Sequence, residues 1–218
     1  MTAAPSTATN ALHPLLAQAQ CLPLVAILRG LQPDEAVAVG RTLVASGFGV
    51  LEVPLNRPGA LECIERLARE LPAEVLVGGG TMLTVADVER VHSAGGRLMV
   101  APNCDAQVIE RAVALGMLAA PGVATPTEAF VALQAGAHAL KLFPAEMVGH
   151  GGLKALKSVL PAGTPLWPVG GVSPESMAPW VAAGATGFGI GSQLYTPGKP
   201  LEAIAAVAAR FIAAWRQI

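Results

Sequence analysis

The sequence predicts an α/β fold, a single (β/α)8 barrel, and three observations support this. Eight short apolar runs recur along the 218 residues, at intervals that each hold one helix and two loops. Helix-start signals follow several runs, and glycine recurs at the helix ends before the next run. Strands that alternate with helices pair in parallel through right-handed crossovers. Eight such units close into a barrel, whereas a doubly wound sheet more often stops at about five or six strands.

The eight apolar runs are expected to be buried strands because they are short and end in turn residues. They cover residues 24–28, 50–54, 75–77, 98–101, 117–120, 140–143, 166–169 and 188–190. Residues 12–19 are expected to form a short N-terminal helix before this TIM barrel, and residues 201–216 a closing helix. We expect residues 1–10 to be flexible and residues 11–218 to form one domain.

Capping sequences mark the helix starts between the strands. Thr125 is followed by proline and, three residues after the cap, by Glu128, which is the pattern of a capping box. Ser173 repeats the proline without a distal glutamate, and Thr84 with Asp87 gives another start. Glycine accommodates a left-handed helix cap, so helix ends are expected around Gly47, Gly96, Gly116, Gly136 and Gly184.

The composition excludes several classes of function. A net charge of -1 gives no electrostatic footprint for nucleic acid or an anionic membrane. The three cysteines are far apart, and the four histidines lack metal-site spacing, so neither a disulfide framework nor a metal site is expected. No signal peptide or membrane span is expected, which favours a cytoplasmic protein. Because 53% of the residues are hydrophobic, other subunits are expected to cover some apolar surface.

Lys141 is a charge inside the apolar run 140–143. Burying an unpaired ammonium is costly and lowers its pKa, which makes the amine a nucleophile toward carbonyls. Glu52 alternates with apolar neighbours in the run 50–54, so both side chains are expected to point into the barrel. Three interpretations stay open: a lysine that reaches solvent from a strand end, a structural ion pair, or a nucleophile with a carboxyl group for proton transfer.

Glycine turns follow the seventh and eighth apolar runs. Gly170 and Gly171 precede a capped helix, and Gly191 with Ser192 follows the last strand. In (β/α)8 barrels the active site lies at the carboxyl ends of the strands, and these two loops often bind phosphate. The pattern therefore favours a phosphorylated substrate over plain turn chemistry.

Seven ordered motifs resemble those of the class I aldolases of the KDPG/KDPGal family, and the resemblance runs over residues 22–211. They are Val-Ala-Ile-Leu-Arg-Gly30, Leu-Glu-Val-Pro-Leu-Asn56, Gly-Gly-Gly-Thr81, Ala-Pro-Asn103, Pro-Gly-Val-Ala-Thr125, Lys-Leu-Phe-Pro-Ala-Glu146 and Pro-Val-Gly-Gly171. The resemblance implies a pyruvate-forming retro-aldol cleavage of 2-keto-3-deoxy-6-phosphosugar acids through a lysine imine. It also implies that no metal or other cofactor is used, and that the chain forms a homotrimer.

The resemblance implies a role for each motif residue. Lys141 would be the Schiff-base lysine, and Glu52 the general acid/base, acting through a water. Thr81 would help to hold the pyruvyl group. The phosphate would bind at Gly170, Gly171, Gly191 and Ser192.

Three positions favour the galactonate over the gluconate epimer of the substrate. The gluconate-type enzymes have an arginine where Asn56 stands and a threonine where Val169 stands, and the galactonate-type enzymes carry an arginine at the position of Arg29. Arg29 is then the expected clamp for the substrate carboxylate, since a guanidinium binds a carboxylate with two parallel hydrogen bonds. Arg57 and His150 depart from the family pattern, and their roles stay open.

Other functions compete with a 2-dehydro-3-deoxy-6-phosphogalactonate aldolase. The nearest is an aldolase of the same family for 2-dehydro-3-deoxy-6-phosphogluconate or 4-hydroxy-2-oxoglutarate. A metal-assisted phosphosugar epimerase or isomerase would need histidine and aspartate ligands at strand ends, which the sequence lacks. A non-catalytic barrel that binds phosphosugars is the third alternative.

Overall fold

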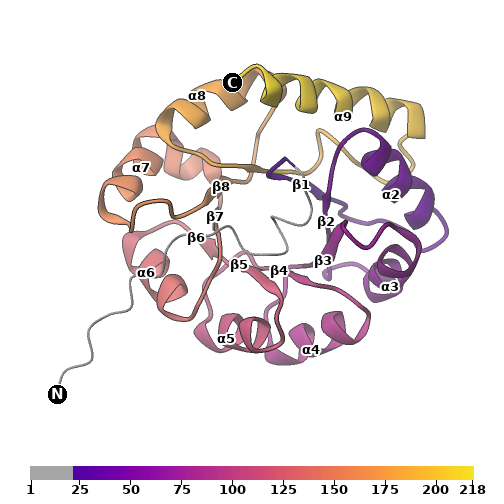
Figure 1. Ribbon diagram of the computed structural model, residues 1–218, viewed down its shortest axis with the longest axis horizontal. Coiled ribbons are helices and arrows are strands. Elements are labelled where there is room, and N and C mark those ends of the chain that lie inside the picture. The colour runs from indigo at the N-terminus through magenta and orange to yellow at the C-terminus, as the bar shows by residue number, and fades with distance from the viewer. Residues whose placement is uncertain (1–21) are drawn as a thin grey trace.

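The computed structural model describes residues 22–218, and in it a parallel sheet curls into a ring that helices surround (Figure 1). The strands are β1 (Leu24–Ile27), β2 (Val50–Pro54), β3 (Leu76–Gly80), β4 (Leu98–Val100), β5 (Leu118–Ala120), β6 (Gly122–Val123), β7 (Leu140–Leu142), β8 (Leu166–Pro168) and β9 (Phe188–Ile190). The predicted helix 12–19 and the predicted flexible segment 1–10 lie outside the described residues.

All strand pairings are parallel, and they follow the predicted order around the barrel. Six strands pair in the order β5-β4-β3-β2-β1-β9, and three in the order β6-β7-β8. A parallel bridge between Val169 and Gly189 joins the second sheet to the first. Since β1 pairs with β9, the first and last strands meet, and α9 packs beside α2 on the outside (Figure 1). The predicted (β/α)8 barrel is confirmed.

Two details of the strands differ from the prediction. The fifth strand is split into β5 and β6 at Pro121, which has no N–H to donate to the ladder. The third strand, expected over residues 75–77, continues through the glycines that follow, and Gly78, Gly79 and Gly80 pair with β2. Glycine is needed there because a Cβ on Gly80 would collide with the carboxylate of Glu52.

The helices cover the outer face of the sheet. They are α2 (Ala36–Ala45), α3 (Ala60–Glu70), α4 (Val85–Ser93), α5 (Ala106–Ala114), α6 (Pro126–Gln134), α7 (Ala145–Val159), α8 (Met177–Ala183) and α9 (Leu201–Arg216), with a 3-10 turn η1 (Pro174–Ser176) before α8. Capping boxes form at Thr84 and Thr125 as predicted. The start predicted at Ser173 is the 3-10 turn, and the left-handed residue after α4 is Gly95 instead of Gly96.

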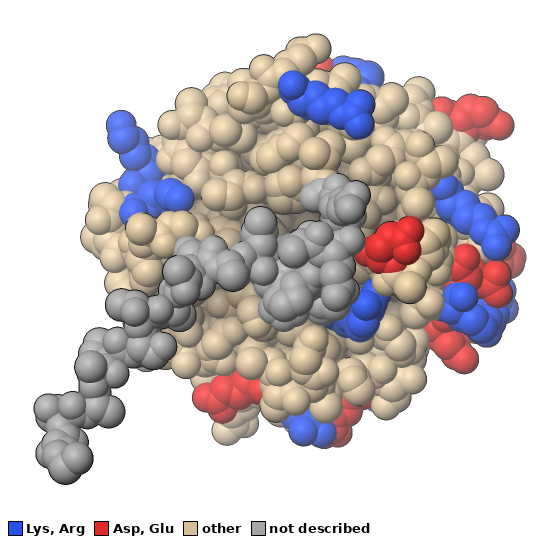
Figure 2. All heavy atoms as spheres, in the orientation of Figure 1, with Lys and Arg blue, Asp and Glu red and all other residues tan. Residues whose placement is uncertain are grey.

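Apolar side chains form two packed layers, one between the sheet and the helices and a smaller one inside the barrel. Apart from Glu52 and Lys141, the charged residues of the described chain are not buried, and Glu70 of α3 pairs with Arg69 and with Arg41 of α2. On the face in Figure 2, acidic and basic groups are mixed near α3, and much of the remaining visible surface is neutral. None of the helices of residues 22–218 is long and apolar enough to cross a membrane.

Candidate active site

Lys141 and Glu52 point into the barrel, as the alternation of their neighbours predicts. Leu51 and Val53 belong to the outer apolar layer, and so do Leu140 and Leu142 on β7. Because side chains alternate along a strand, Glu52 and Lys141 face the interior. Their exposed fractions are only 2% and 7%. The strands therefore hold an amine and a carboxyl group in a space that is poorly solvated.

The two groups are close but do not form an ion pair. A cavity of about 10 Å³ is lined by both side chains, together with Trp167 and Val169. All six ion pairs within residues 22–218 join an arginine to an Asp or Glu, and none includes Lys141 or Glu52. Glu52 Oε2 is buried and has no hydrogen-bond partner among the described residues. A buried carboxylate oxygen without a partner is unusual in a purely structural role, so a reacting group is the better interpretation.

Burial moves the pKa values of the two groups toward each other. It raises the pKa of Glu52, and the positive charges of Lys141 and Arg29 oppose this. It lowers the pKa of Lys141; the charge of Glu52 opposes this shift and that of Arg29 adds to it. Lys141 Nζ also lies 4.7 Å from the centre of the Phe143 ring. The amine is therefore easier to deprotonate than a free lysine, and the carboxyl group easier to protonate than a free glutamic acid.

Thr81 follows β3 directly and has an unusual backbone. Its φ is 54°, and it is the one non-glycine residue within 22–218 with a positive φ. Such a conformation is costly for a β-branched residue, and strained residues gather at functional sites. Thr81 is half-buried next to the glycine that makes room for Glu52. The structure thus places it at the rim of the barrel, near the predicted pyruvyl end of the site.

A pocket of about 680 Å³ opens at the carboxyl ends of β1, β8 and β9. Six of the predicted substrate-binding residues line it: Arg29, Val169, Gly170, Gly171, Gly191 and Ser192. Val169 also lines the interior cavity of Lys141 and Glu52, so it connects the two spaces. The pocket thus joins the predicted carboxylate clamp to the two predicted phosphate turns.

Arg57, whose role the sequence left open, lines the same pocket. Arg29 and Arg57 are both exposed, and neither guanidinium pairs with another described residue. Two unpaired cations in one pocket favour an anionic ligand. Within residues 22–218, no group of three or more His, Cys, Asp or Glu side chains could hold a metal ion.

Asn56, a predicted substrate-binding residue, and His150, whose role was left open, lie outside the pocket lining. Asn56 is exposed in the loop after β2 and is not part of the pocket lining, although its neighbour Arg57 is. His150 of α7 lies against Trp180 of α8, with ring centroids 4.2 Å apart, on the outer helical layer. The structure therefore does not bring these two side chains to the other site residues.

Some site residues escaped the sequence reasoning. The carboxylate of Glu146 lies against the glycine turn, where a Cβ on Gly171 would come within 2.8 Å of it. Tyr195, the single tyrosine of the chain, is 2% exposed and lines the pocket beside Ser192. Tyr195 comes three residues after Ser192, and this position in the sequence could have indicated that it lies near the pocket.

Fold and site together place the protein among the (β/α)8 barrels with a lysine and a carboxylic acid in the barrel interior. The family model described as KDPG and KHG aldolase matches residues 15–207. The chain therefore belongs to the KDPG and KHG aldolase family.

Individual relatives agree with this family. The chain is 45% identical over 196 residues to the 2-dehydro-3-deoxy-6-phosphogalactonate aldolase of Escherichia coli strain K12, covering 90% of this chain and 96% of that protein. It is 49% identical to a probable enzyme of the same name from Rhizobium meliloti, covering 81% of this chain and 83% of that one. Among solved structures, a native KDPGal structure matches with a TM-score of 0.88 at 45% identity, covering 90% and 95%.

Proposed function

We propose that this protein is a class I 2-dehydro-3-deoxy-6-phosphogalactonate aldolase, which cleaves its substrate to pyruvate and glyceraldehyde 3-phosphate. The observation that carries the proposal is the placement of Lys141 and Glu52. Both are buried in the barrel interior without forming an ion pair, next to a pocket with unpaired arginines and glycine turns. The relatives at 45% and 49% identity support the same reaction.

The chemistry follows from the amine and the carboxyl group. Neutral Lys141 attacks the C2 carbonyl, and loss of water gives an iminium ion. When the C4 hydroxyl passes its proton to the Glu52 carboxylate, directly or through a water, the C3–C4 bond breaks. Its electron pair moves into the iminium, which leaves an enamine, and the aldehyde departs. A proton from Glu52 to C3 and hydrolysis by water then release pyruvate and free Lys141.

The pocket supplies binding for the two anionic ends of the substrate. In this proposal Arg29 binds the C1 carboxylate, and Thr81 holds the pyruvyl group. Gly170, Gly171, Gly191 and Ser192 receive the phosphate through backbone N–H groups at the glycine turns that follow β8 and β9. The positive φ of 121° at Gly170 and 60° at Gly171 supports a turn that only glycine adopts easily.

We propose the galactonate epimer as the substrate because Arg29 and Val169, the residues that favour it, both line the pocket. The second candidate within the family is an aldolase for 2-dehydro-3-deoxy-6-phosphogluconate or 4-hydroxy-2-oxoglutarate. A KHG/KDPG aldolase of Escherichia coli is 31% identical, below the galactonate relatives. Values of kcat/KM on the two C4 epimers decide between these, and a clear gluconate preference would contradict our assignment.

We also propose that the protein is a cytoplasmic homotrimer with one domain. Exposed apolar side chains such as Phe130, Val131 and Met147 support burial against other subunits. Sedimentation of the full chain tests this, since a monomer at micromolar concentration would exclude a stable trimer.

One experiment tests the reaction class and the nucleophile together. The protein is incubated with pyruvate and borohydride, and its intact mass and peptide map are measured. We expect a single pyruvyl adduct on Lys141, formed equally well after treatment with a chelator. Failure to trap the adduct would contradict the aldolase, and loss of cleavage on chelation would favour a metal-assisted enzyme.

A further inference from the structure

A hydrogen bond joins two of the three loops that carry the predicted anion-binding residues, the loops after β1 and β9. The Tyr195 hydroxyl donates to Glu35 Oε1 at 2.5 Å, across 160 residues of sequence. Tyr195 belongs to the loop after β9, which carries Ser192, and Glu35 ends the loop after β1, which carries Arg29. Because β1 pairs with β9, these loops are neighbours, and the bond connects the loop of the predicted carboxylate clamp to one loop of the predicted phosphate site.

The Tyr195 side is well suited to hold a fixed position. Tyr195 is 2% exposed, and its burial and the nearby Glu35 both raise the pKa of the phenol, so it keeps the proton that it donates. Its backbone N–H donates to the Gly191 carbonyl at 3.1 Å, which forms a tight turn around Ser192. Lys199 fastens the same loop by donating to the carbonyls of Gln193 and Leu194, both at 2.9 Å.

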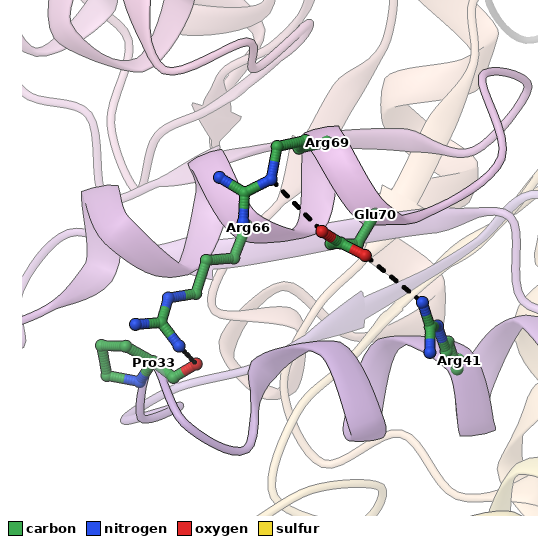
Figure 3. Close-up of polar contacts among 5 residues, drawn as sticks. All are labelled: Pro33, Arg41, Arg66, Arg69 and Glu70. Atoms are coloured by element: carbon green, nitrogen blue, oxygen red, sulfur yellow. Dashed lines mark hydrogen bonds and ion pairs between the residues drawn. The ribbon is translucent and has the colours of Figure 1, made fainter.

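The Glu35 side is held along its length. The Gln32 backbone N–H donates to the same Glu35 oxygen at 3.3 Å, and the Gln32 side chain donates to the Gly30 carbonyl at 2.9 Å. Arg66 of α3 donates to the Pro33 carbonyl at 2.9 Å (Figure 3). These bonds brace the short loop between Arg29 and Glu35.

The two loops also meet directly at the pocket. A Cβ on Gly30 would lie 3.0 Å from Pro197 Cγ, so glycine permits the close approach of one loop to the other. This contact is apolar and allows sliding, whereas the Tyr195–Glu35 bond is directional and has a carboxyl acceptor. The hydrogen bond thus adds a directional side-chain contact between the two loops.

We propose that Tyr195 and Glu35 are positioning residues, whose hydrogen bond sets the spacing between the two anion-binding loops and so selects substrates that carry a terminal phosphate. This inference rests on the proposed function. A substrate with a carboxylate at one end and a phosphate at the other is sensitive to that spacing. A substrate that lacks the phosphate engages only one of the loops.

Tyr195→Phe is the direct test, because it removes the hydroxyl and keeps the buried ring. The two substrates are 2-dehydro-3-deoxy-6-phosphogalactonate and its dephosphorylated form, which share the reacting carbons. We expect kcat/KM to fall about tenfold for the phosphorylated substrate, mainly through KM, the loss typical of a hydrogen bond to a carboxyl group. The value for the dephosphorylated substrate is expected to fall much less.

Variants of Glu35 separate the acceptor from the tyrosine. Glu35→Gln keeps an oxygen that accepts from Tyr195 and should retain the phosphate preference, whereas Glu35→Ala should lose it as Tyr195→Phe does. The double variant Tyr195→Phe/Glu35→Ala should lose no more than either single variant. Glu35→Ala also decides the question if Tyr195→Phe fails to fold. Ser158→Ala is the matched control, since it removes an exposed hydroxyl that donates to Ala155 on α7.

Every variant is also tested for the pyruvate adduct on Lys141. Failure of the wild-type protein to form the adduct would contradict the proposed function itself. If the wild-type protein forms the adduct and cleaves the substrate, equal losses on the two substrates would show a general structural role. No loss on either substrate would show that the bond has no part in selection, and both of these results would overturn the inference.

Discussion

In the barrel interior, Lys141 and Glu52 project from strands and are almost fully buried, whereas Arg29 and Arg57 stand on loops of the pocket and are exposed. The strand residues are placed by hydrogen-bonded register, with Glu52 beside Gly78 and Lys141 between β6 and β8. The loop residues depend on turns and on contacts between loops. The comparison suggests that the reaction is set by the strands and substrate selection by the loops.

The largest expected effect is at the nucleophile in the interior. Lys141→Ala removes the amine that forms the imine, so cleavage should fall by at least about a thousandfold, with no pyruvate adduct in the mass spectrum. Lys157→Ala, a lysine near the end of α7, serves as the control and should keep full activity. An adduct that persists in Lys141→Ala would place the nucleophile elsewhere.

Glu52→Gln should cost about 10²–10⁴-fold in kcat while pyruvate binding is retained, because it removes proton transfer and keeps the shape of the side chain. In the wild-type protein, kcat/KM should fall as the pH falls through the raised pKa of Glu52, since a protonated carboxyl group cannot accept the C4 proton. Glu52→Gln should lack this limb of the pH profile. An unchanged profile in the variant would assign the acid limb to another group.

The burial of Lys141 and Glu52 in the barrel interior is also expected to lower the free energy of unfolding. A raised pKa at Glu52 contributes stability below its usual pKa and loses it as the pH rises through the raised value. A lowered pKa at Lys141 contributes stability above its usual pKa and loses it as the pH falls through the lowered value. At neutral pH both ionised forms are therefore unfavourable.

Lys141→Met/Glu52→Gln should consequently raise the free energy of unfolding at neutral pH by about 1–4 kcal/mol, as replacement of buried charges often does. Urea denaturation of the inactive double variant and the wild-type protein measures the difference. A double variant that is less stable than the wild type would show that the two charges stabilise each other in the fold.

The difference between strands and loops also explains what could be predicted from the sequence. Side chains along a strand alternate with a period of two. The pattern of Leu51, Glu52 and Val53 therefore predicts which side of β2 faces inward. No comparable period exists in a loop, and Arg57 and Asn56 are neighbours of which only one lines the pocket. The role of His150 stayed open for the same reason, since nothing in its segment indicates that it contacts the ring of Trp180.

Gly80 and Pro121 show a second limit of what the sequence predicts. Glycines usually mark turns, but the run that ends at Gly80 forms a strand because the Glu52 carboxylate needs the space of a missing Cβ. Pro121 interrupts the ladder on its donor side, while its carbonyl still accepts from the Lys141 N–H at 2.9 Å. Both features depend on neighbours that are distant in the sequence, and local propensity does not contain them.

Val169 lies at the junction of the two regions and should have an intermediate effect. Val169→Thr adds a hydroxyl next to the reacting carbons, so the ratio of kcat/KM for the gluconate and galactonate epimers should shift toward gluconate by about five- to tenfold. Steady-state kinetics on both epimers measures this, with Val169→Ala as the control for lost volume. An unchanged ratio would move epimer selection to the loops.

The smallest effect is expected away from both regions, at the start of α4. The Thr84 hydroxyl accepts from the Asp87 N–H at 3.1 Å, and the Asp87 carboxylate accepts from the Thr84 N–H at 3.0 Å. Thr84→Ala should lower the free energy of unfolding by about 1 kcal/mol, the usual value of an N-cap, and leave kcat/KM unchanged. Thr127→Ala, an exposed threonine inside the first turn of α6, should change neither quantity. A drop in kcat/KM for Thr84→Ala would show that the cap helps to hold the strained Thr81, three residues before it, and would extend the active site into the outer layer of the barrel.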